Sequence, residues 1–388
     1  MININKIFYF DNCAATAPDI RVINTMCDVM KNCYANAAST HNFGINSQKI
    51  IENAKKYILN FLNTDGHICF TSGGTEANNI AIFGGARAKK RSYYTKENGN
   101  KKKFGKIITT SSEHASVLSC IPILESEGFE VIVLNPNTSG EFDLKLFEEI
   151  IDKNTILVSV MFVNNETGAI NPIKKISEII QKKSKSLLHV DAVQAFGKIP
   201  IDITNLNIDL MSCSAHKIHG PKGIGFVYIS QNLNINPIIY GEGPEKFRPG
   251  TLPVELIAGF EAAIRNCDLI KDYNHVLNLN NYLRKKLVKL NNIFINSPKN
   301  SLAYIINFSI KGIKSEIMLN FLSANNIFLS AASACSGHKK SHVLASLNLP
   351  EDLINSAIRV GFSKFNNFEE IEFLVQMLQK AYTSTIKI

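Results

Sequence analysis

The chain has 388 residues, of which 45% are hydrophobic, and a formal net charge of +9. This length allows one large domain and a smaller one. Its apolar runs are interrupted every few residues and stay below the roughly 18 residues that a membrane helix needs, so no membrane association is expected. The N-terminus lacks the features of a secretory signal or a transit peptide, and a cytoplasmic protein is therefore expected.

The eight cysteines are scattered along the chain, without a C-x-x-C pair and without His or Cys at zinc spacing. They are therefore expected to be reduced thiols, and no metal site is predicted. Much of the excess positive charge lies in two stretches, 89–91 and 101–106, on either side of a polar segment. This pattern favours a solvated, mobile loop over a binding site for an acidic protein, and RNA is not expected as a stable ligand.

Between about residues 47 and 260, helical and β-prone patterns alternate. Apolar residues at helical spacing predict helices over 50–62, 115–127 and 173–182. Short β-prone runs predict strands over 68–70, 107–109, 131–133, 155–163, 187–190 and 226–229. This alternation is typical of an α/β fold in which a mainly parallel sheet is covered by helices on both faces.

After about residue 260 the pattern changes to that of a smaller α+β domain. It predicts helices over 258–289, 315–323 and 368–382, and strands over 303–310 and 327–329. No low-complexity linker separates the two parts, so they are expected to share an extensive interface. We predict a large domain over 15–257 and a small domain formed by 1–14 and 258–388.

Residues with chemical potential follow the predicted strands, where open α/β sheets bind their ligands. Gly74 and Thr75 lie where a strand runs through two glycines into a helix, so a phosphate fits at this helix start. Asp191 ends an apolar run, an unfavourable place for a carboxylate without a cationic partner. A protonated ring nitrogen of a cofactor is one such partner, and capping of the next helix is an equally good explanation.

A third segment places Lys217 after an apolar strand and before a glycine-rich turn. Ser214 and His216 precede the lysine as possible phosphate donors. A lysine among cationic neighbours is biased toward its neutral, nucleophilic form. A surface lysine in a loop does not explain this ordered Ser-x-His-Lys series, so the functional interpretation is preferred.

With these three elements in this order, the chain resembles the class V aminotransferase branch of the fold-type I pyridoxal phosphate (PLP) enzymes. The closer resemblance is to the NifS/IscS-type cysteine desulfurases. It extends over nearly the whole chain, through the motifs at 11–18, 36–41, 74–75, 113–114, 164–168, 191–194, 212–225, 248–251, 333–335 and 358–359.

The resemblance implies a role for each matching residue. Lys217 would carry PLP as a covalent imine and move protons, while His114 would stack on the ring. Asp191 would pair with the ring nitrogen, Gln194 with the ring oxygen, and Asn165 would orient the ring.

The resemblance further implies residues for the phosphate and the substrate. Thr75, Ser214 and His216 would hold the phosphate beside Gly74, joined by Thr251 from the second subunit of a homodimer. Arg359 would bind the substrate carboxylate through its planar fork, and Asn36 is also expected to bind substrate.

Cys335 distinguishes a desulfurase from other PLP enzymes of this fold. It lies in a loop of small residues, and His338, Lys339 and Lys340 supply positive charge that would favour its thiolate. The resemblance implies that Cys335 attacks the sulfur of L-cysteine, which leaves alanine and a persulfide. The sulfur would pass to an acceptor protein, for iron–sulfur cluster assembly or for thiolation of RNA or cofactors.

Two other functions remain open. The chain would also suit another class V PLP enzyme, such as a cystine or selenocysteine lyase or a small-amino-acid aminotransferase. It would alternatively be a catalytically reduced paralogue that binds partners. The intact set of Lys217, Asp191, His114 and Arg359 argues against the paralogue.

Overall fold

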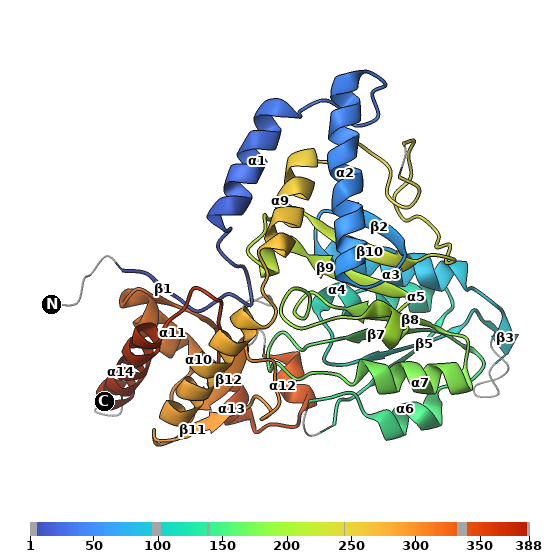
Figure 1. Ribbon diagram of the computed structural model, residues 1–388. Coiled ribbons are helices and arrows are strands. Elements are labelled where there is room, and N and C mark those ends of the chain that lie inside the picture. Colours follow the sequence, from blue (N-terminus) through green and yellow to red (C-terminus); the bar gives the residue numbers. More distant parts are fainter. Residues whose placement is uncertain (1–5, 95–101, 138–139, 244, 332–339, 386–388) are drawn as a thin grey trace.

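The computed structural model describes residues 6–94, 102–137, 140–243, 245–331 and 340–385. Its larger part is built on a seven-stranded sheet (Figure 1). In spatial order, the strands are β2 (Gly66–Thr71), β10 (Gly225–Ser230), β9 (Leu210–Ser214), β8 (Leu187–Asp191), β7 (Thr155–Met161), β5 (Lys106–Thr110) and β6 (Glu130–Leu134). β10 runs opposite to the other six strands of this sheet, which are all parallel to one another. The predicted mainly parallel sheet is therefore confirmed.

The strands of this sheet have apolar residues at consecutive positions. Because consecutive residues point to opposite sides of a sheet, both of its faces are apolar. Ile108, Val158 and Leu188 belong to one buried cluster, together with residues of α2 (Asn42–Phe61), α7 (Ile173–Lys183) and α9 (Val254–Arg265). The residues just before them, Ile107, Leu157 and Leu187, belong to a second cluster with α3 (Gly74–Ala88) and α5 (Ile121–Ser126). Helices therefore cover both faces, as predicted.

The smaller part contains a four-stranded antiparallel sheet in the order β11 (Ile293–Ile295), β12 (Ile305–Ile310), β15 (Ala357–Gly361) and β14 (Ser330–Ala331). The helices α10 (Lys271–Leu287), α11 (Ser315–Ala324) and α14 (Phe368–Thr385) lie beside it (Figure 1). Strand β1 (Phe8–Tyr9) joins this part by pairing in parallel with β13 (Ile327–Phe328). The domain boundaries at 14/15 and 257/258 remain predictions.

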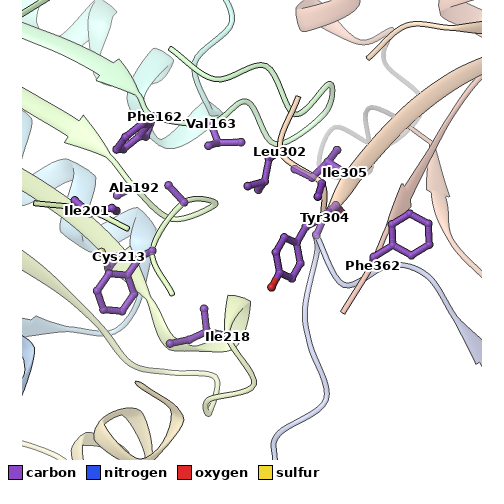
Figure 2. Close-up of a cluster of buried hydrophobic side chains, with 14 of the residues drawn as sticks. Phe162, Val163, Ala192, Ile201, Cys213, Ile218, Leu302, Tyr304, Ile305 and Phe362 are labelled. Carbon is purple, nitrogen blue, oxygen red and sulfur yellow. The ribbon is translucent and has the colours of Figure 1, made fainter. Parts of the chain in front are cut away.

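The two parts share one buried apolar cluster. Figure 2 shows Leu302, Tyr304 and Ile305 of the smaller part facing Val163 and Ile218 of the larger part. An interface of this kind holds the loops at the sheet edge in a fixed position relative to β12 and β15.

Some predicted elements differ in their limits. The helix predicted over 258–289 is two helices, because Asp268 Oδ1 accepts hydrogen bonds from the amides of Ile270 and Lys271 and starts a new helix there. The helix predicted over 115–127 is divided into α4 (Ala115–Leu118) and α5, which has Pro122 in its first turn. The remaining helices are α1 (Ile20–Asn32), α6 (Leu144–Ile150), α8 (Ile203–Leu206), α12 (His342–Ser346) and α13 (Glu351–Asn355).

The basic segment predicted as a mobile loop has ordered ends. Strand β3 (Tyr93–Tyr94) pairs antiparallel with β4 (Lys102–Lys103), and residues 95–101 lie outside the described residues. Across the described ranges, no helix has the length and apolar character to cross a bilayer. Nor do the described residues contain a group of His, Cys, Asp and Glu side chains that would hold a metal ion.

Candidate active site

The carboxyl ends of β2, β5, β7, β8 and β9 meet around one pocket of about 260 Å³. In open α/β sheets this edge is where ligands bind. Most of the residues predicted from the sequence line this pocket: Gly74, Thr75, His114, Asn165, Asp191, Gln194, Ser214, His216, Lys217 and Arg359. Segments far apart in the chain thus supply amine, imidazole, carboxylate, hydroxyl and guanidinium groups to one cavity.

Lys217 ends a single 3-10 turn that directly follows β9. Its Nζ donates hydrogen bonds to the carbonyl oxygens of Cys13 and Ala14, each at 2.7 Å. The N-terminal segment therefore holds the amine at the pocket wall, where it can reach a carbonyl compound bound in the cavity.

The start of α3 forms a corner of the pocket whose chemistry suits an anion. Gly73 has a φ of +153°, and a Cβ on Gly74 would lie 2.8 Å from Cγ2 of Val193, so glycine is needed at both positions. Ser214 Oγ lies 2.8 Å from Nδ1 of His216 on the other side of this corner. Burial, with a smaller contribution from the Lys217 cation, lowers the pKa of His216 to about 4, so its ring is neutral at pH 7.

Asp191 presents a buried carboxylate at the end of β8 and is 5% exposed. It accepts hydrogen bonds from Asn78 Nδ2 at 2.7 Å and from the Val193 amide at 3.0 Å. Among the described residues it forms no ion pair. A buried carboxylate with only neutral donors favours a cationic ligand in the adjoining pocket.

The tautomer of His114 follows from its position as the N-cap of α4. Its Nδ1 accepts a hydrogen bond from the Ser116 amide at 3.1 Å, so the proton of the neutral ring is on Nε2. Burial lowers the pKa of His114 and favours this neutral form. His114 therefore offers an N–H donor rather than a second cation beside Lys217.

Arg359 lies on β15 and is 4% exposed. Its Nη1 donates to the carbonyl oxygen of Asn165 at 2.9 Å, while Nη2 donates to Ser330 Oγ at 2.9 Å and to Asp11 Oδ1 at 3.1 Å. Its buried Nε has no hydrogen-bond partner among the described residues. The guanidinium thus connects the smaller part to the residues around the pocket.

Sequence and structure comparisons agree with this geometry. The profile of the class-V aminotransferase family matches residues 8–374. The cysteine desulfurase IscS of Plasmodium falciparum is 40% identical over 387 residues, covering 96% of this chain and 68% of that protein. The IscS of Buchnera aphidicola (subsp. Baizongia pistaciae) is 38% identical over 96% of this chain and 92% of its own length. A solved NifS-like protein has a TM-score of 0.89 at 32% identity, over 97% of this chain and 100% of that one.

The chain belongs to the cysteine desulfurases of the class-V aminotransferase family. Its fold is that of this family, as the sequence resemblance predicted. The assignment of individual roles to the pocket residues remains a prediction.

Two of the predicted site residues that the structure describes do not line the pocket of this desulfurase. Thr251 is exposed and lies just before α9, which leaves its predicted role in a second subunit untested. Asn36 is also exposed, and its Oδ1 accepts a hydrogen bond from the Ala38 amide. Cys335 lies outside the described residues.

Asn78 and Ser116 connect site residues of this desulfurase to one another and were not predicted from the sequence. Asn78 Nδ2 donates to both Asp191 and Ser116 Oγ, at 2.7 and 2.9 Å, and Ser116 Oγ lies 2.8 Å from His114 Nδ1. One buried amide thereby fixes both the carboxylate and the imidazole. Its position four residues after Gly74, one helical turn, was the available signal.

Glu113 belongs to the motif at 113–114, but no role was predicted for it. It is fully buried, and its Oε1 accepts hydrogen bonds from the Met161 amide at 2.9 Å and from Thr110 Oγ1 at 2.8 Å. Its Oε2 has no partner among the described residues. Burial raises the pKa of Glu113 to about 8, so the carboxyl group is protonated at pH 7.

This raised pKa predicts a pH-dependent stability. Between about pH 4.5 and 8 the unfolded chain releases the Glu113 proton and the folded chain keeps it, so the free energy of unfolding falls as pH rises. The contribution is about 1.4 kcal/mol per pH unit at most. Glu113→Gln should reduce this slope in urea unfolding at pH 5 to 8, whereas Glu125→Gln, at an exposed position, should not. Equal slopes for Glu113→Gln and the unmodified protein would contradict the prediction.

Proposed function

We propose that this cysteine desulfurase uses PLP held at Lys217 to transfer the sulfur of L-cysteine to Cys335, with release of L-alanine. The observation that carries the proposal is the arrangement of one pocket. It has an amine at Lys217, a buried carboxylate at Asp191 that forms no ion pair within the described ranges, and a glycine-lined helix start at Gly74.

The residues of the pocket fit PLP. Asp191 matches a protonated pyridine nitrogen, because it is a buried carboxylate without an ion-pair partner in the described part of the chain. The start of α3 has no side-chain cap, so its backbone N–H groups would be offered to a phosphate, and Ser214 and His216 add donors. Gln194 would face the ring oxygen, and Asn165 would help to orient the ring.

Bound PLP supplies an electron sink for bonds at the α-carbon of an amino acid. The chain supplies positioning and proton transfer. Lys217 would move a proton at the substrate α-carbon, and the neutral ring of His114, with its proton on Nε2, would stack on the bound ring. Arg359 lines the pocket and would bind the substrate carboxylate there, held in place by Asn165 and Asp11.

The residues on both sides of 332–339 support a role for Cys335 in this pocket. Ser330, five residues before Cys335, accepts a hydrogen bond from Arg359. Ser341, six residues after it, donates to Glu166 Oε2 at 2.5 Å, in the same turn as Asn165. The described residues on both sides of this segment thus contact the pocket wall or the turn beside it, which supports the proposed role of Cys335.

The proposed transfer is balanced without another reactant. The Cys335 thiolate attacks the substrate sulfur, an S–S bond forms, and the Cβ–S bond of the substrate breaks. A proton completes the methyl group of alanine, and Cys335 keeps the sulfur as a persulfide. A solved structure supports the choice of substrate. The SspA protein, solved in complex with cysteine, is 31% identical to this chain, with a TM-score of 0.79.

The partners follow from the same proposal. The chain would form a homodimer in which Thr251 reaches the phosphate of the neighbouring subunit, and an acceptor protein would remove the persulfide sulfur. The proposed location of this chain is the cytoplasm. One relative, 39% identical, is a mitochondrial cysteine desulfurase of Saccharomyces cerevisiae.

Product analysis tests the proposal. The purified protein with added PLP should convert L-cysteine to alanine, with one sulfide released per alanine when a thiol reductant is present. A 2-oxo acid as the main product would favour an aminotransferase. Activity on cystine or selenocysteine but not on cysteine would favour a lyase.

The close approach at Gly74 gives a further prediction. Gly74→Ala should weaken PLP binding about tenfold, because the added Cβ displaces Val193 and narrows the anion corner. Removing the opposing methyl groups in Gly74→Ala/Val193→Ala should restore most of the affinity. PLP titration followed by visible absorbance measures both variants, with Val193→Ala as the control. An unchanged affinity in Gly74→Ala would show that this corner does not bind the phosphate.

A further inference from the structure

A buried lysine with no part in the function proposed above lies directly behind the pocket. Lys198 follows β8 in a turn and is only 5% exposed. Its Nζ donates a hydrogen bond to Gln194 Oε1 at 3.0 Å and lies 5.5 Å from the ring centroid of Tyr304. Tyr304 belongs to the interface between the two parts of the molecule (Figure 2).

The chemistry of the two side chains determines which way the Gln194 amide faces. An ammonium group has donors and no acceptor, so only the oxygen of Gln194 can face Lys198. The amide nitrogen must then face the pocket, where Nε2 donates to the Cys13 carbonyl oxygen at 3.0 Å. The Cys13 carbonyl oxygen can only accept, so this contact favours the same orientation, and Lys198 and Cys13 fix the amide together.

The charges around Lys198 make this contact costly to maintain. Burial lowers the pKa of Lys198 to about 8, and the cations of Lys217 and Arg359 lower it as well, whereas the thiols of Cys13 and Cys267 raise it. His216 and His219 are further titratable groups that interact with Lys198. A lysine buried among cations costs folding free energy, and its hydrogen bond to Gln194 offsets part of that cost.

We propose that Lys198 is a positioning residue that holds Gln194 with its N–H groups toward the cofactor, so that Gln194 acts as a donor to the ring oxygen. The inference rests on the proposed binding of PLP at this pocket. With PLP bound, an N–H of Gln194 donated to the ring oxygen would stabilise the negative charge on that oxygen. Loss of the proton at the Lys217 nitrogen would therefore become easier. The nearby Lys198 cation acts in the same direction, because it repels the positive charge of the protonated form.

The test is a pH titration of the visible absorption of the PLP-loaded protein. In Lys198→Met, the midpoint should rise by roughly half a unit or more, because both effects that favour proton loss are removed. Lys198→Arg keeps a donor-only cation and should titrate nearly as the unmodified protein does. Lys106→Met is the matched control. Lys106 is also buried, but it starts β5, at the end of that strand away from the pocket, and it pairs with Asp152 at 2.9 Å.

A double-variant cycle shows whether Lys198 acts through Gln194. Gln194→Leu alone should raise the midpoint, and adding Lys198→Met should then shift it by less than in the single Lys198→Met protein, because only the direct effect of the Lys198 cation is left to lose. An unchanged midpoint in Lys198→Met, or fully additive shifts, would overturn the inference.

Should Lys198→Met fail to fold, Gln194→Glu provides a second measurement. A carboxylate would accept from Lys198 and present no donor to the ring, so this variant should fold and still show a raised midpoint; an unaltered midpoint would overturn the inference. If the unmodified protein itself gains no visible absorption with PLP, the proposed function fails instead.

Discussion

Lys217→Ala is expected to remove the visible absorption of the PLP-loaded protein and to lower cysteine desulfuration by about 10³-fold or more. The amine of Lys217 reaches the pocket from the end of β9 and is held by the carbonyl groups of Cys13 and Ala14. The described lining of the pocket contains no other lysine that would replace it. Absorption spectra and alanine formation measure the two effects.

The matched control is Lys222→Ala. Lys222 is an exposed lysine in the same glycine-rich segment, and its loss should leave both colour and rate nearly unchanged. A coloured Lys217→Ala protein that still forms alanine would place the cofactor linkage elsewhere.

Cys335→Ala is expected to separate cofactor binding from sulfur transfer. The variant should keep the absorption of bound PLP, because the residues proposed to hold PLP lie at the sheet edge and do not include Cys335. Alanine and sulfide formation should fall about 100-fold or more, because no thiol is left to accept the sulfur.

Cys27→Ala is the control for this variant, since Cys27 is an exposed thiol on α1 and far in sequence from the loop. Mass spectrometry after a single turnover should find one added sulfur on Cys335 in the control and none in Cys335→Ala. Desulfuration by Cys335→Ala at the full rate would exclude the persulfide mechanism and favour a lyase.

Much of the site was predictable because it lies at strand ends. Asp191 and Lys217 each follow an apolar run, and parallel strands bring such residues to one edge whatever the loops do. Gly74 was predictable for a similar reason, since two glycines before a helix indicate a close approach of the backbone.

The supporting contacts were not predictable from the same patterns. Lys198 looks like a surface residue in the sequence, and only the fold of the turn after β8 and the Tyr304 side chain enclose it. Asn78 and Ser116 meet because α3 and α4 lie against each other, a contact that neither periodicity nor spacing specifies. The break between α9 and α10 depends on local competition by Asp268 for backbone amides, which apolar periodicity does not detect.

The pairing of β1 with β13 has a consequence for synthesis on the ribosome. Phe8 is among the first described residues to leave the exit tunnel, and its partner, Ile327, emerges more than 300 residues later. The carbonyl groups of Cys13 and Ala14 that hold Lys217 follow β1 closely in sequence. The nascent chain can therefore build the seven-stranded sheet early, whereas the wall around the reactive amine is anchored only after Ile327 has emerged.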